Sequence, residues 1–175
     1  MGQGRAAIAV ALAFPMRTPE ERKMNVTQES YSELFADLAS NLVTGRASIT
    51  STSFADREQV DLTPENPRAA RIRAILPKNR GRGITLVIGT GTIFEIPDTG
   101  GRYTECHSAV EEARTISMAV IAGRFTERVR IGKKDRVVSS VGTVDIPPPV
   151  TVRWRRLRLN PFQRTSVKHI KYEPY

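Results

Sequence analysis

Two short β-branched segments, residues 84–88 and 92–96, flank a Gly-Thr-Gly stretch at residues 89–91. A dinucleotide-binding loop has the pattern Gly-x-Gly-x-x-Gly between a strand and a helix, so that amides at the helix start hold the pyrophosphate. Here the third glycine position is Phe94, and the segment continues as a strand up to Pro97. The stretch therefore predicts a hairpin turn, or a bulge in one bent strand, at the centre of a sheet.

Two other segments carry the apolar spacing of amphipathic helices. Residues 27–45 form one, and residues 104–123 form the other, with either Thr104 or Ser108 as the N-cap and Gly123 as the stop. The expected apolar faces consist of Tyr31, Leu34, Phe35, Leu38 and Leu42 in the first helix, and of Cys106, Ala109, Val110, Ala113, Val120 and Ile121 in the second.

The rest of the chain is rich in strand-forming segments separated by turn residues. Two of them precede the segments around the Gly-Thr-Gly stretch, and four follow the second helix, at residues 124–131, 136–146, 151–159 and 166–175. Short turns require antiparallel pairing, and two helices can cover only one face of such a sheet. We therefore predict an α+β fold in which a single antiparallel meander sheet carries two main helices on one face. The expected order is helix, three or four strands, helix, three or four strands.

This order of elements resembles the layout of type III secretion chaperones and of several small immunity proteins of bacterial toxin systems. The resemblance is one of element order alone, because no sequence motif accompanies it. It implies a protein that binds another protein, and a shared architecture does not by itself determine a function.

Length and cysteine content limit the domain organisation and the compartment. Residues 24–175 suffice for a single α+β domain, and residues 1–23 are expected to form a flexible or weakly structured extension. The single cysteine, Cys106, excludes an intrachain disulfide, so we expect a cytoplasmic protein. A weak secretory signal at residues 1–13 is the alternative. No apolar run reaches the roughly 18 to 20 residues that a membrane span needs.

Positive charge is concentrated in the last third of the chain. Residues 124–175 hold thirteen basic and four acidic residues, whereas residues 1–123 have no net charge. In the segment VRWRRLRL, arginines surround Trp154 and leave neither face of a strand purely apolar, which favours a sheet edge. We predict a binding surface here, made of Arg153, Trp154, Arg155, Arg156, Arg158, Arg164, Lys168 and Lys171.

Such a cluster of cations attracts an acidic protein or another polyanion. The principal prediction is a non-enzymatic protein-binding module, of the immunity, chaperone or assembly-factor type, which docks an acidic partner with Trp154, Phe162 or Tyr172 as an apolar anchor. The alternative is a nucleic-acid-associated protein that uses the same strands. The sequence is equally consistent with arginines that bind no partner and only protect a sheet edge from aggregation. An exposed edge strand would also allow two copies of the chain to pair.

The chain offers few groups for catalysis or metal binding. Cys106 and His107 are neighbours that project about 100° apart on a helix, so they do not easily share a metal ion. Cys106 and His169 would form a nucleophile and base only if the fold brought them within hydrogen-bond reach. Glu111 and Glu112 diverge on the helix and suit its positive start. We predict no catalytic residue, metal or cofactor, and an enzyme of unidentified class is the lesser alternative.

Overall fold

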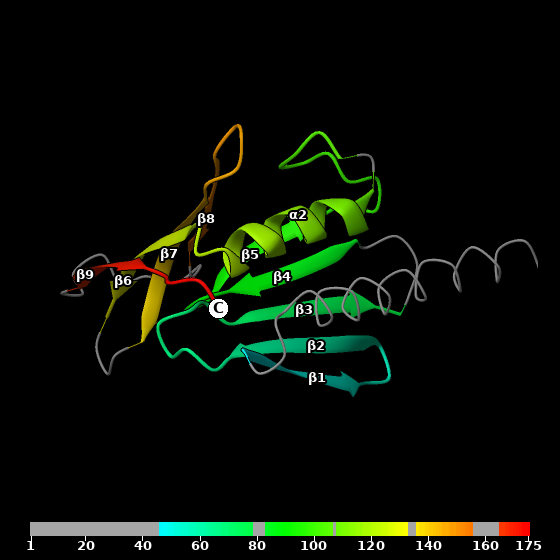
Figure 1. Ribbon diagram of the computed structural model, residues 1–175, viewed down its shortest axis with the longest axis horizontal. Coiled ribbons are helices and arrows are strands. Elements are labelled where there is room, and N and C mark those ends of the chain that lie inside the picture. The colour runs from blue at the N-terminus through cyan, green and yellow to red at the C-terminus, as the bar shows by residue number, and fades with distance from the viewer. Residues whose placement is uncertain (1–45, 79–82, 107, 133–135, 156–164) are drawn as a thin grey trace, which may run out of the picture.

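The computed structural model describes residues 46–78, 83–106, 108–132, 136–155 and 165–175, with only the backbone of residues 154 and 155. The helix expected at residues 27–45 and the extension expected at residues 1–23 lie outside these ranges. The described residues form nine strands in two antiparallel sheets and one helix (Figure 1).

The first sheet is a meander of five antiparallel strands that pair in chain order. Its strands are β1 (Ala47–Ser53), β2 (Arg57–Pro64), β3 (Ile72–Pro77), β4 (Ile84–Ile88) and β5 (Thr92–Ile96). Buried and half-buried residues alternate along β3 and β4, so one face of the sheet is apolar. The predicted hairpin between β4 and β5 is confirmed, with Gly89 and Gly91 at positive φ angles of 63° and 132° in its turn. Its predicted place at the centre of a sheet is wrong, because β5 is an outer strand.

The second sheet has four antiparallel strands in the order β8-β7-β6-β9. Its strands are β6 (Phe125–Ile131), β7 (Val137–Val144), β8 (Val150–Arg155) and β9 (Ser166–Lys171). Burial alternates strictly along β6 and β7, which again gives one apolar face. β9 is the last strand in sequence, but it pairs with β6, so β6 and β7 lie between the two outer strands.

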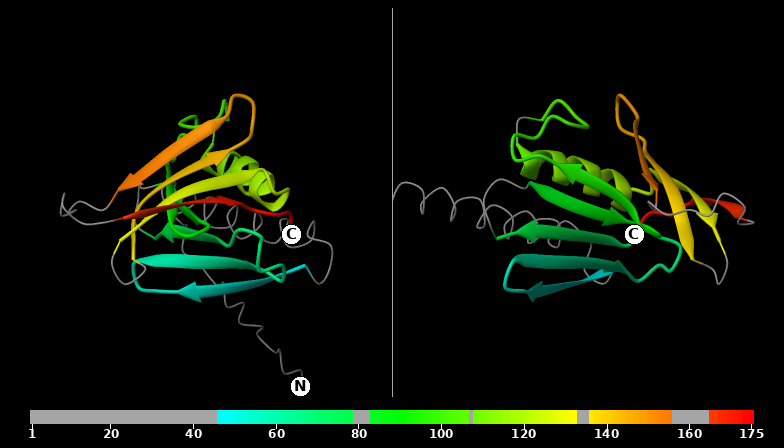
Figure 2. Two further views of the ribbon diagram at one scale, coloured as in Figure 1. Left: turned by 90° about the vertical axis from the view of Figure 1, so that its left-hand side faces the viewer. Right: turned by 180° about the vertical axis from the view of Figure 1, so that it is seen from behind.

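The single described helix, α2 (Ala109–Ile121), lies along β4 and β5 and also contacts β7 (Figures 1 and 2). Its N-cap is Ser108, whose hydroxyl accepts a hydrogen bond from the amide of Glu111 at 3.2 Å. The helix thus begins after Thr104, the other cap that the sequence allowed. In the described part of the chain, no helix is long and apolar enough to cross a membrane.

The predicted single sheet with two helices on one face is wrong. The strands before and after α2 form separate sheets, and only one helix is present among the described residues. Each sheet has one apolar face, and these faces are buried against each other and against α2, in a common core that includes Leu86, Phe94, Phe125 and Val144. The resemblance to chaperones and immunity proteins depended on the predicted element order, so it loses its support.

The two sheets approach closely where β5 meets the second sheet. Gly142 of β7 lies against Thr92, and a Cβ atom at Gly142 would lie 2.5 Å from Thr92 Cγ2 and 2.9 Å from the Phe125 ring. Only glycine leaves room for this contact. Phe125 in turn stacks on Tyr172, with ring centroids 5.3 Å apart.

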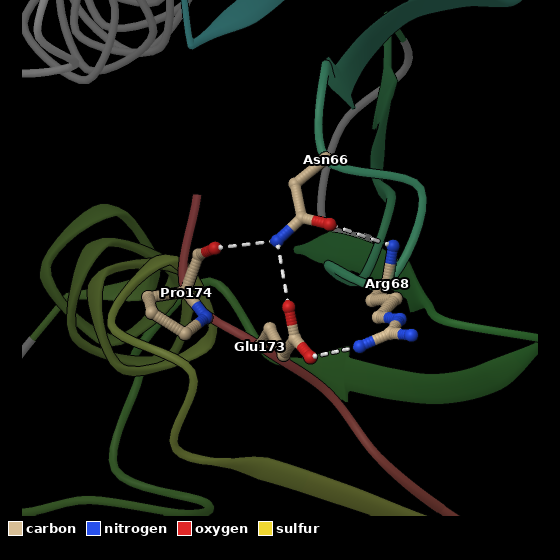
Figure 3. A network of polar contacts seen from close by, with 4 residues as sticks. All are labelled: Asn66, Arg68, Glu173 and Pro174. Atoms are coloured by element: carbon tan, nitrogen blue, oxygen red, sulfur yellow. Dashed lines mark hydrogen bonds and ion pairs between the residues drawn. The ribbon is translucent and has the colours of Figure 1, made fainter.

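The end of the described chain is held against the first sheet (Figure 3). Glu173 forms a parallel β-bridge with Ala69, and its carboxylate accepts hydrogen bonds from Arg68 at 3.1 Å and from Asn66 at 3.2 Å. The Asn66 side chain also donates to the carbonyl of Pro174 at 3.2 Å. These contacts tie the connection between β2 and β3 to the segment that follows β9.

Candidate binding site

The candidate binding residues gather on the outer face of the second sheet, the face turned away from the core. We define this outer face by the residues that alternate with the buried positions of β6 and β7 and by their partners in register on β8 and β9. Among the described side chains, it includes Thr126, Arg128, Arg130, Val137, Ser139, Val141, Thr143, Thr151, Arg153, Val167, His169 and Lys171. The left view of Figure 2 looks onto this sheet.

Strand register places the basic residues of the outer face in neighbouring rows. Arg128 is opposite His169 on β9 and opposite Val141 on β7, and Val141 is opposite Arg153 on β8. His169, Arg128 and Arg153 therefore share one row across four strands. Arg130 belongs to the next row, two residues along β6 and on the same face.

These rows surround a shallow hollow of about 420 Å³. It is lined by Arg128, Arg130, Ser139, Ser140, Val141, Arg153, Val167 and His169. The lining therefore combines three arginines, a histidine and two serines with two valines. Val167 is 51% exposed, so the hollow offers apolar as well as charged contacts.

The cations of the two sheets differ in their partners. In the first half of the structure, five arginines form ion pairs with carboxylates, namely Arg57, Arg68, Arg71, Arg73 and Arg102. On the outer face of the second sheet there is no Asp or Glu among the described residues. Accordingly, Arg128, Arg130 and Arg153 have no ion pair with any other residue in the described ranges. Their like charges are close together and uncompensated within this part of the chain.

The only carboxylate on the four strands themselves, Glu127, lies on the opposite, buried face of β6 and is 2% exposed. Its Oε2 atom accepts hydrogen bonds from the Thr90 amide at 3.0 Å, the Thr90 hydroxyl at 2.8 Å and the Tyr172 hydroxyl at 2.9 Å. Its Oε1 atom accepts from the Thr92 hydroxyl at 2.6 Å, which lies 3.0 Å from the Ser140 hydroxyl. Burial raises the pKa of Tyr172 well above its ordinary value, as do the Glu127 charge and hydrogen bond. Both carboxylate oxygens are occupied, so Glu127 serves as a structural anchor for β6.

The Gly-Thr-Gly turn contributes to this anchor. A Cβ atom at Gly89 would lie 2.5 Å from the Tyr172 hydroxyl and 2.7 Å from Glu127 Oε2. Glycine at this position therefore lets the turn approach the carboxylate closely enough for Thr90 to bind it. The turn that resembles a phosphate loop in sequence holds a carboxylate of its own chain.

The structure divides the predicted binding residues. Arg153 lines the hollow, and Lys171 lies on the same face, opposite Thr126. Lys168 is opposite the buried Val129 and therefore lies on the other side of β9, where it is exposed. The backbones of Trp154 and Arg155 belong to β8, opposite Ser140 and Ser139. Arg156, Arg158, Arg164 and Phe162 lie outside the described residues.

Two expectations about the site need correction. Tyr172 was a predicted apolar anchor, but it is only 8% exposed and donates its hydroxyl hydrogen to Glu127, so it cannot contact a partner. Arg128, Arg130 and His169, which line the hollow, were not among the predicted binding residues. The segment FTERVRI did contain the signal, because Arg128 and Arg130 alternate with Val129 in a strand-like pattern.

The candidate catalytic groups belong to different parts of the fold. Cys106 precedes α2, and its Sγ atom lies 3.7 Å from the Thr115 hydroxyl. His169 lines the hollow, whose lining contains no Cys, Asp or Glu. Glu112 is buried and accepts hydrogen bonds from the backbone amides of Tyr103 and of Thr104, the latter at 2.8 Å. In the described ranges, no group of three or more His, Cys, Asp or Glu residues is placed to hold a metal ion.

Comparison with protein-family models, with curated proteins and with solved structures finds no match for this chain. A function for this chain is therefore inferred from the outer face itself.

Proposed function

We propose that this protein is a non-enzymatic binding module that docks an acidic protein on the outer face of its second sheet. The observation that carries the proposal is the set of three arginines, Arg128, Arg130 and Arg153, that line one hollow without a carboxylate partner among the described residues. An anionic surface placed on this face would supply the missing counter-charges. It would do so at several side chains at once.

The physical basis is the field of clustered like charges. Cations that share one face produce a strong positive potential, whereas the potential of cations that are dispersed and paired with carboxylates is largely cancelled. The positive potential accelerates the approach of an acidic surface. The other exposed arginines described above already have carboxylate neighbours and add little to such a field. An acidic partner is therefore attracted to the second sheet.

The composition of the hollow favours a protein over a nucleic acid. Val141 lies between Arg128 and Arg153 in register, and Val167 lies opposite Arg130, so a partner can bury apolar side chains as well as pair its carboxylates. Single-strand nucleic-acid binders use aromatic side chains on which bases stack. Among the described side chains, no aromatic residue lies on the outer face.

Nucleic acid is the second candidate, and one observation favours it. The Ser139 hydroxyl lines the same hollow as the arginines, and hydroxyl and guanidinium groups together are common ligands of phosphate. Binding to phosphates would be sequence-independent and would weaken steeply as salt is raised.

The test compares an acidic polypeptide with oligonucleotides as probes. Poly-L-glutamate and single- and double-stranded oligonucleotides would each be titrated from low to physiological salt against the wild-type chain. A module that docks acidic proteins should still bind poly-L-glutamate at physiological salt but should no longer bind the oligonucleotides. Retention of the oligonucleotides alone would instead support the second candidate, and loss of every probe would refute both.

Matched variants would then locate the site. Arg153→Gln and Arg57→Gln each remove one positive charge, but Arg57 already pairs with Asp56 at 3.2 Å on the first sheet. We expect Arg153→Gln to weaken poly-L-glutamate binding about tenfold, or about 1.4 kcal/mol, and Arg57→Gln to leave it unchanged. Equal effects of the two variants would show that only net charge matters, which contradicts a docking site.

A further inference from the structure

β9 forms an outer edge of the second sheet. It pairs with β6 on one side, and no described strand pairs with its other side. Five of its six residues are exposed, and the sixth, Ile170, is half-buried. The main-chain groups on the free side of such a strand are available to pair with another extended chain.

β9 also carries positive charge on both of its faces. Lys171 and His169 lie on the outer face, whereas Lys168 lies on the opposite one. No acidic residue occurs in the strand, SVKHIK. β1 and β5, the outer strands of the first sheet, provide an internal comparison, because ASITSTS contains no charge and TIFEI contains only one acidic residue. Protection against aggregation alone does not explain why the cationic edge strands, β8 and β9, both belong to the second sheet.

We propose that an acidic, extended segment of the partner adds to the second sheet as a new strand along β9. This inference rests on the proposed function and specifies how part of the partner is held. In strand addition, main-chain hydrogen bonds supply affinity, and alternate side chains on the two faces supply specificity. Carboxylates on one face of the added strand would lie beside His169 and Lys171, and those on its other face would lie beside Lys168.

The position of Lys168 distinguishes strand addition from docking on the outer face alone. A partner that only covers the hollow does not reach Lys168, since this side chain points to the other side of the sheet. A partner strand beside β9 has side chains on both faces and therefore reaches it. Pairing of β9 with the β9 of a second copy would place two cationic strands side by side, which disfavours a homodimer at this edge.

The experiment uses a synthetic ten-residue peptide, EETTEETTEE, whose glutamates lie on both faces of an extended strand, and two derivatives of it. Each derivative is N-methylated at alternate residues, one on each edge of the extended peptide. Binding to the full chain would be measured at physiological salt, together with amide hydrogen exchange of β9 and β1. We expect the unmodified peptide to bind and to slow exchange in β9 but not in β1. One derivative, the one methylated on the edge that faces β9, should bind at least tenfold more weakly.

The variant Lys168→Gln should weaken binding of the unmodified peptide about threefold to tenfold. Arg57→Gln serves as the control, because it makes the same change of charge. If both methylated derivatives and Lys168→Gln bind as well as their references, strand addition is overturned. Continued loss of binding in Arg153→Gln would in that case leave the proposed function intact. If no acidic peptide or poly-L-glutamate binds, the proposed function fails as well.

Discussion

The hydroxyl of Thr92 donates a hydrogen bond of 2.6 Å to the carboxylate of Glu127 and thereby joins β5 of the first sheet to β6 of the second. The same carboxylate accepts from Thr90 and Tyr172, so four donors from three segments of the chain converge on it. None of these donors carries a charge. The next residue along β6, Arg128, points to the outer face. The buried anchor thus holds the strand whose other side forms the candidate site.

We predict that Glu127→Gln destabilises the protein by about 1–3 kcal/mol, because an NH₂ group would face donors that now bind a carboxylate oxygen and would leave at least one of them unpaired. Urea unfolding followed by circular dichroism would measure the loss. Glu105→Gln, at an exposed position before α2, is the matched control and should change stability by less than about 0.5 kcal/mol. Equal stability of the two variants would mean that the buried network does not hold the sheets together.

The alternation of FTERVRI shows what sequence can and cannot predict here. It places Glu127 on the same side of a strand as Phe125 and Val129, so a buried carboxylate was open to prediction from the pattern. The hydrogen-bond partners of Glu127 could not be predicted, because Thr90, Thr92 and Tyr172 are 35 to 45 residues away along the chain. Local patterning identifies buried faces, and tertiary contact decides which faces meet.

The same limit explains the error in the fold. The hairpin at residues 89–91 and the helix near residues 109–121 depend on local turn and capping residues, and both are present. The partition into two sheets depends on whether β5 pairs with a later strand, which no local pattern specifies. The pairing of β9 with β6 rather than β8 is likewise a long-range choice, and it places Lys168 and Lys171 at an edge.

The protein should lose stability at acid pH because of Asp61. Burial raises its pKa, but hydrogen bonds from Arg73 and Gln59 and the charges of Arg71 and Arg73 outweigh burial and lower the pKa below its ordinary value. A carboxylate with a lowered folded pKa stabilises the fold above its unfolded pKa, about 3.9, and this contribution is lost as the pH falls through and below that value.

The corresponding variant is Asp61→Asn, which should lower the free energy of unfolding at pH 7 by about 1–3 kcal/mol. The difference from wild type should shrink between about pH 5 and pH 3 as the wild-type carboxylate is protonated. Urea unfolding at several pH values would measure it, with Asp56→Asn, whose side chain is 65% exposed, as the control. A difference that does not change with pH would contradict a charged role for Asp61.

The contacts of Figure 3 predict that Asn66 matters more than the ion pair beside it. Asn66 donates to both Glu173 and Pro174 and accepts from the Arg68 amide at 3.0 Å, whereas the Arg68 side chain is 79% exposed in its pair with Glu173. Asn66→Ala should cost about 1–2 kcal/mol, and Arg68→Gln should cost less than about 1 kcal/mol. Thermal and urea unfolding would rank the two, and the reverse order would show that the salt bridge holds the chain end.

The cationic outer face should reduce the stability of the protein when no partner is bound. Arg128 shares a row with His169 and Arg153 and lies two residues from Arg130 on the same face. Replacing it by glutamine relieves repulsion between like charges and should raise the free energy of unfolding by a few tenths to about 1 kcal/mol at low salt. This gain should vanish near 1 M salt, where the Debye length is about 3 Å.

The matched control is Arg57→Gln, which loses an ion pair and therefore should not gain stability. Urea unfolding of the wild type and both variants at low and high salt would measure the difference. If Arg128→Gln lowers stability at low salt, Arg128 has a counter-charge within its own chain, and the outer face is not poised for an external acidic partner. If stability rises while poly-L-glutamate binding falls, the same arginine that strains the free protein is the one that holds its partner.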